Sequence, residues 1–177
     1  MIALSVPEGS PRNGVRTENL ADFAARCGVE LLRFAYLLSG DRYRAEDLVQ
    51  DVLLAMYRRF GDTRLPLDNP LGYARRALAN TNVSWSRRAA GHELLTDRLP
   101  DGGVNPEDPA DRDELWRALR QLPLRQRTVL VMRFYADAAD NEIAAALDCR
   151  RGTVRSLASR GLAALRSDPT LSGGGAS

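Results

Sequence analysis

The stretch from Asp140 to Arg166 constrains the fold of this chain more than any other. It contains two segments with helical apolar periodicity, Asn141 to Leu147 and Thr153 to Leu165, separated by the turn Asp148-Cys149-Arg150. We expect Asp140 to cap the first of these helices. Two short helices joined by a tight turn predict a helix-turn-helix.

The second helix of this pair presents a basic face that also carries hydroxyl groups. Ala144 is small enough to let the helices cross closely, and Val154 and Leu157 are placed to close their core. Gly152-Thr153 offers a break and a capping hydroxyl before this helix, and arginine and hydroxyl side chains suit phosphates and base edges. The pattern favours DNA recognition, and a solvated basic helix in an ordinary bundle is the alternative interpretation. The candidate DNA contacts are Arg150, Arg151, Thr153, Arg155, Ser156, Ser159 and Arg160.

Charge is distributed unevenly along the 177 residues, although the formal net charge is only +2. All 25 basic residues are arginine. Segments 70–92 and 115–135 contain four and five arginines and no acid, while segment 93–114 between them contains eight acids. Two basic blocks with an acidic connector indicate a polyanion that is bound at two places.

The composition argues against several other classes of protein. Cys27 and Cys149 are far apart and His92 is the only histidine, so we expect no metal site and a reducing compartment, the cytoplasm. No apolar run approaches membrane-spanning length, so no membrane insertion is expected. No catalytic constellation is visible in the sequence, so we expect neither an enzyme nor a cofactor.

The N-terminal half of the sequence begins with two predicted helices. The first runs from about Thr17 to the stop signal Ser39-Gly40. The second, Ala45 to Phe60, is the most regular amphipathic segment of the chain. Its acidic side is by default a solvated surface, and the alternative is a docking surface for a basic partner. The residues on that side are Glu46, Asp47, Gln50 and Asp51.

A third helix is predicted from Leu71 to about Arg88, with Asn69-Pro70 as its cap and first-turn proline. Aromatic rings interleaved with Arg and Asn can stack on unpaired bases while cations hold the backbone. A basic surface helix with Tyr73 and Trp85 in the core explains the same residues, and these residues alone slightly favour it. The candidate nucleic-acid contacts are Tyr73, Arg75, Arg76, Asn80, Trp85, Arg87 and Arg88.

Residues 91–110 combine Gly, Pro and acids without apolar periodicity, which predicts a flexible acidic linker able to span about 70 Å when extended. This linker divides an all-α chain into two small domains, a helical domain at 17–90 and a helix-turn-helix domain at 111–168. The other expected segments are disordered tails at 1–16 and 169–177 and helices at Asp111–Gln121 and about Arg125–Tyr135.

Several segments, in this order, resemble a known family. They are AEDLVQDV, then NPLGYARRALANTNVSW, then LPLRQRTVLVMRF with EIAAAL and GTVRS. Together they are similar to the extracytoplasmic-function group of bacterial sigma-70 RNA polymerase sigma factors, over about Phe23 to Arg166. Asp148 stands where that family usually has Gly, and Asp tolerates the left-handed backbone of such a turn better than most residues. The resemblance implies a non-enzymatic initiation factor that makes core RNA polymerase promoter-specific.

The resemblance also implies partners for each segment. The acidic helix would dock on the clamp helices of the polymerase's largest subunit, and the Leu71–Arg88 helix would open and recognise the -10 promoter element. The helix-turn-helix would recognise the -35 element, while its domain meets the flap of the second-largest subunit. The resemblance leaves room for an anti-sigma factor as a further partner.

Two other functions remain open at this point. A helix-turn-helix transcriptional regulator acting without polymerase docking would leave AEDLVQDV and the Arg/aromatic helix without a role. An adaptor or anti-sigma-like protein that binds no DNA would leave the two basic segments without acids unexplained.

Overall fold

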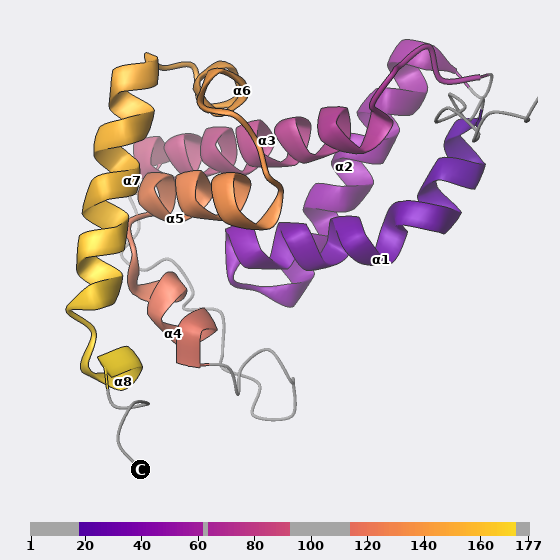
Figure 1. The fold of residues 1–177 in the computed structure, drawn as a ribbon. Helices are drawn as coiled ribbons and strands as arrows, with labels where there is room; N and C mark the ends of the chain where they lie inside the picture. Colours follow the sequence, from indigo (N-terminus) through magenta and orange to yellow (C-terminus); the bar gives the residue numbers. More distant parts are fainter. Residues whose placement is uncertain (1–17, 62–63, 93–113, 173–177) are drawn as a thin grey trace, which may run out of the picture.

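The structure is a computed structural model that describes residues 18–61, 64–92 and 114–172 (Figure 1). These residues form helices joined by turns, with one isolated β-bridge between Asn19 and Arg64, so the expected all-α class is confirmed. The predicted tail at 1–16 and the linker beyond His92 lie outside the described residues. The helices are α1 (Leu20–Ser39), α2 (Arg42–Phe60), α3 (Pro70–His92), α4 (Glu114–Gln121), α5 (Leu124–Leu130), the π-helical segment η3 (Val131–Tyr135), α6 (Asp140–Ala146), α7 (Arg151–Arg166) and α8 (Pro169–Ser172).

Local capping residues set the ends of the N-terminal helices. Gly40 ends α1 with a left-handed φ of 76°, as its stop signal predicted. Asp41 then caps α2, accepting a 2.7 Å hydrogen bond from the backbone nitrogen of Arg44. Asn69 caps α3 in the same way, because the backbone nitrogen of Gly72 donates to its Oδ1 at 2.8 Å. The predicted start at Asn69-Pro70 is confirmed.

The two domains that the linker predicts pack directly on each other. Helices α1, α2 and α3 pack together, as do α5, α6 and α7, and α3 also contacts α5 and α6 (Figure 1). One buried cluster runs through both groups and includes Phe34 of α1, Leu78 of α3, Met132 of η3 and Ile143 of α6. The apolar faces therefore form one continuous core.

The C-terminal half differs from the prediction in two places. The helix expected to continue to Tyr135 widens into η3, where the backbone nitrogen of Ala136 donates to the oxygen of Val131 at 3.2 Å. The expected disordered tail begins instead with one helical turn, α8, which contacts α4 and α7. Pro169 suits the first position of a helix because it lacks the N–H that would be unpaired there.

Candidate nucleic-acid interface

The acidic side chains of α2 lie on its outer side. Asp47, Gln50 and Asp51 are exposed, while Leu48 and Val52 on the opposite face are buried in the core. Glu46 is half-buried and pairs with Arg42, whose Nε lies 3.1 Å from Glu46 Oε1. The core therefore does not need the three exposed polar residues, which are available to a partner.

The candidate residues of α3 divide into packed and exposed groups. The Tyr73 ring meets the Phe60 ring edge-on, with centroids 5.6 Å apart. The guanidinium of Arg44 lies 5.9 Å from the ring centre of Trp85. Tyr73 and Trp85 are both half-buried. These two contacts favour the core-packing interpretation of the aromatic residues.

The side chain of Arg75 makes its contacts within the protein. It pairs with Glu30 of α1 and lies over the Phe34 ring at 5.8 Å, and its side chain is only 16% exposed. Asn80, Arg87 and Arg88, by contrast, are exposed. The cationic surface of α3 therefore lies toward its C-terminal end.

The helix-turn-helix has the core that the sequence predicts. Ile143, Ala144 and Val154 are buried, and Leu157 is half-buried against the same cluster. Asp148 has a left-handed φ of 47°, so this residue does take the glycine-like conformation of the turn.

Both helix starts in this motif differ from the prediction. Helix α6 has Ala139 as its N-cap, and Glu142 accepts a 3.0 Å hydrogen bond from the Ala139 backbone nitrogen. Asp140 does not cap the helix because its carboxylate pairs with Arg133 and Arg155. Helix α7 has Arg150 as its N-cap without a side-chain cap, so Gly152 and Thr153 lie inside its first turn.

All seven candidate residues around α7 are exposed. Arg155 Nε lies 3.5 Å from Asp140 Oδ2, although the Arg155 side chain remains 68% exposed. The hydrogen bond from Arg133, with help from Arg155, lowers the pKa of Asp140. The pairing of Asp140 with Arg133 and Arg155 could not be predicted from the sequence, where Asp140 has the position of a capping residue.

Sequence reasoning also missed two arginines that hold the motif in place. Arg125 Nη2 donates to the backbone oxygen of Leu147 at 3.1 Å, which fixes α5 to the turn of the motif. Arg76 Nη1 of α3 lies 3.7 Å from Glu142 Oε1 of α6, so a residue predicted to bind DNA here joins the two domains. Stacking of the Phe34 and Tyr135 rings, with centroids 6.2 Å apart, lies between the same domains.

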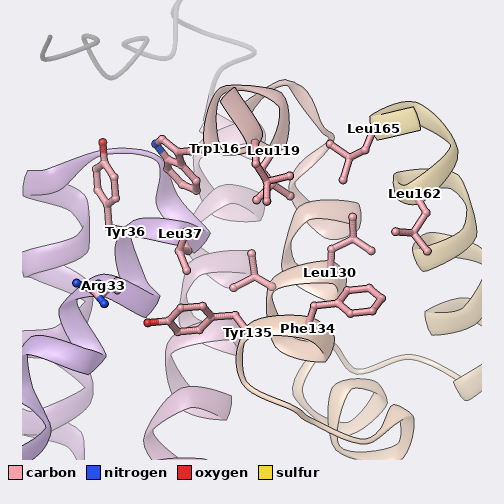
Figure 2. Close-up of a pocket in the computed structure, with 12 residues that line it drawn as sticks. Arg33, Tyr36, Leu37, Trp116, Leu119, Leu130, Phe134, Tyr135, Leu162 and Leu165 are labelled. Atoms are coloured by element: carbon pink, nitrogen blue, oxygen red, sulfur yellow. The ribbon is translucent and has the colours of Figure 1, made fainter. Parts of the chain in front are cut away.

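An apolar groove of about 540 Å³ lies between α1, α4, η3 and α7 (Figure 2). Phe134 is 65% exposed at this groove and Leu115 is 48% exposed. Leu162 and Leu165 approach from α7, and Arg33 stands at the α1 side. The groove therefore offers an apolar surface that the packed core does not cover.

In the described ranges, no cluster of His, Cys, Asp and Glu could hold a metal ion. Cys27 is buried, and burial raises the pKa of its thiol. Among the helices that the structure describes, none is long and apolar enough to cross a membrane.

Two family models match the chain. The model described as Sigma-70 region 2 matches residues 23–91, and the model described as Sigma-70, region 4 matches residues 118–167. The RNA polymerase sigma-E factor of Streptomyces avermitilis is 38% identical over 143 residues, covering 78% of this chain and 78% of that protein. The ECF RNA polymerase sigma factor SigE of Mycolicibacterium smegmatis is 31% identical over 76% of this chain and 55% of that protein.

Two solved structures share the fold. The sigma factor RpoE in complex with the anti-sigma factor NepR, from Bartonella quintana, superposes with a TM-score of 0.63 at 24% identity, covering 82% of this chain and 94% of that one. CnrH in complex with the cytosolic domain of CnrY gives a TM-score of 0.55 at 23% identity, covering 84% and 85%. At these identities the likeness concerns the fold.

Proposed function

The chain belongs to the extracytoplasmic-function group of sigma-70 family RNA polymerase sigma factors, and on that premise we propose a role for each of its exposed surfaces. It is a sigma factor that directs promoter-specific transcription initiation. The observation that carries the assignment of surfaces is the exposure of all seven candidate residues of the helix-turn-helix. A regulator acting without polymerase docking is not favoured, because both sigma regions match.

Helix α2 docks on core RNA polymerase. Asp47, Gln50 and Asp51 form its contact with the clamp helices of the largest subunit, and Glu46 extends that contact. Their exposure supports this role, because a partner can bind them without disturbing Leu48 and Val52 beneath.

Helix α3 contacts the -10 element. Asn80, Arg87 and Arg88 are exposed and bind the DNA directly. Tyr73, Arg75 and Trp85 act mainly by holding the helix, since they pack against other side chains. Arg76 joins the DNA contacts when its pair with Glu142 opens.

Helix α7 contacts the -35 element in the major groove. Arg155 lies near the helix start, the end that approaches base edges in this motif, and Arg160 lies farther along, toward the phosphates. Arg150, Arg151, Thr153, Ser156 and Ser159 complete that contact surface.

The two domains separate when the factor engages a promoter. Elements centred near -10 and -35 are about 25 base pairs apart, roughly 85 Å of duplex. The packed arrangement, with α3 against α6, cannot reach both elements. Core polymerase supplies the separation, and free protein binds promoter DNA weakly because its packed domains cannot engage the two elements together.

The remaining partners follow from the family and from the apolar groove. The groove around Phe134 receives the flap of the second-largest subunit, because its apolar lining suits an apolar helix face. An anti-sigma factor is a further partner, since the sigma factor RpoE of the similar solved structure is bound to the anti-sigma factor NepR. The protein acts in the cytoplasm, where its polymerase lies, and performs no catalysis of its own.

Run-off transcription with purified core polymerase on genomic fragments tests this function. Promoter-dependent transcripts should appear only when the protein is added. Tight, sequence-specific shifts of duplex DNA by the protein alone, without such transcripts, would support the regulator alternative.

A further inference from the structure

Two arginines of the C-terminal domain rest against the turn between α1 and α2, and Arg44, in the first turn of α2, lies close enough to act on the charge of Arg127. Arg44 lies in the first part of α2, Arg120 in α4 and Arg127 in α5. A Cβ atom at Gly40 would lie 3.5 Å from Arg120 Nε and 3.8 Å from Arg127 Nη1, so both side chains rest against this turn. None of the surfaces assigned above uses these three residues.

The charges of Arg44 and Arg127 are not balanced by ion pairs. Neither guanidinium pairs with a carboxylate in the part of the chain that the structure describes. Arg44 Nη2 donates to Ser86 Oγ at 2.9 Å and Arg127 Nη1 donates to the Arg120 backbone oxygen at 3.3 Å. The Nε atoms of Arg44 and Arg127 are buried without a hydrogen-bond partner among the described residues.

Burial makes this arrangement of positive charges costly. Burial, together with the charges of Arg120 and Arg44, lowers the pKa of Arg127 to about 10. Burial also lowers the pKa of Arg44, against the attraction of Asp41. Arg127 still keeps its proton at neutral pH, so its charge and that of Arg44 remain near each other in a half-buried place, where a bound anion is stabilising.

We propose that this cluster is a binding site for a tetrahedral oxyanion of the phosphate class. The planar guanidinium fork matches phosphate oxygens and can donate two parallel hydrogen bonds to them. Arg44 comes from the N-terminal domain, while Arg120 and Arg127 come from the C-terminal domain. A phosphate held between Arg44 and Arg127 stabilises the packed arrangement of the two domains.

Thermal unfolding of the full chain tests the site, with sodium phosphate and ATP titrated separately at an ionic strength kept constant with sodium chloride. A saturable rise in melting temperature of roughly 5 °C or more is expected at about 100 times the dissociation constant. Arg127→Gln and Arg44→Gln should each abolish the rise. Arg58→Gln, which changes an exposed arginine of the same helix α2, should retain it.

The separate titrations with phosphate and ATP distinguish a site for the free anion from a site for a nucleotide. A rise with both phosphate and ATP supports a site for the free anion, and a rise with ATP alone supports a nucleotide. No rise with either over chloride, or equal rises in Arg58→Gln, Arg44→Gln and Arg127→Gln, overturns the proposal. Circular dichroism identifies a variant that fails to fold. If Arg127→Gln does not fold, the result with Arg44→Gln tests the proposal. Because polymerase is absent, the outcome is independent of the transcription assay.

Discussion

Arg76 Nη1 of α3 lies 3.7 Å from Glu142 Oε1 of α6, which places an ion pair between the helix assigned to the -10 element and the helix-turn-helix. The two side chains are 42% and 40% exposed. Each residue thus helps to hold the packed arrangement that, in the proposed mechanism, opens on promoter binding.

Glu142→Gln should lower the free energy of unfolding by less than about 1 kcal/mol, because the pair is well exposed to solvent. The substitution keeps an oxygen that can accept from the Ala139 backbone nitrogen, so the start of α6 is preserved. Urea denaturation of Glu142→Gln, Arg76→Gln and the double variant measures the coupling. Fully additive effects would mean that the two residues do not interact in solution.

Asp47→Arg combined with Asp51→Arg should abolish association with core polymerase and leave the fold intact. Both residues are exposed, and the new positive charges would oppose a basic surface on the clamp helices. A pull-down of core polymerase measures the association, with circular dichroism to check folding. Asp68→Arg, at an exposed acid in the loop before α3, is the control for the charge change of one such substitution. Unchanged capture by the folded double variant would refute the docking assignment.

Arg155→Ala should cost roughly 1–3 kcal/mol of promoter binding and relax the preference at one base of the -35 element. Arg160→Ala should weaken binding to all promoters alike, because a phosphate contact carries no sequence information. Competition between promoters with altered -35 bases, in the presence of core polymerase, measures the promoter affinity and the base preference of both variants. Retained base preference in Arg155→Ala would exclude its role at base edges.

Asp140 should make stability depend on acid pH. Its pKa is lowered in the folded protein from an ordinary value of 3.8, first by the hydrogen bond from Arg133. A lowered folded pKa means that its contribution is complete above the unfolded pKa and is lost as pH falls through the folded pKa. Melting temperatures of the wild type and Asp140→Asn should therefore differ most above about pH 5 and converge at lower pH. A constant difference across this range would contradict the pairing.

Two glycines of α7 should respond to alanine in opposite directions. A Cβ at Gly161 would lie 2.9 Å from Leu130 Cδ1 of α5, so Gly161→Ala should destabilise the protein by about 1–3 kcal/mol. A Cβ at Gly152 meets nothing within 4 Å, so Gly152→Ala should stabilise by less than about 1 kcal/mol through helix propensity, because Gly152 lies in the first turn and not in the middle of the helix. Urea denaturation measures both, and a stabilising Gly161→Ala would show that α5 and α7 do not pack this closely.

The helices and the faces of the helix-turn-helix could be predicted because they depend on neighbours in sequence. The apolar period of α2 placed Leu48 and Val52 inside and Asp47 and Asp51 outside, and the structure places them so. Asn69 and Gly40 marked helix ends through their own backbone and capping chemistry. The segments that resemble the sigma-70 family likewise lie within single helices or pairs of adjacent helices.

Local sequence determined where the helices run, which side of each is apolar and which family the chain belongs to, because all of these depend on the spacing of residues that are close in sequence. Only the tertiary structure decided that Arg75 is committed to Glu30, that Arg76 meets Glu142, and that Asp140 pairs with arginines instead of capping α6. An arginine has the same helical position whether it faces DNA or a carboxylate of another helix. Its role depends on the helix packed opposite, and that packing comes from the continuous core between the two domains.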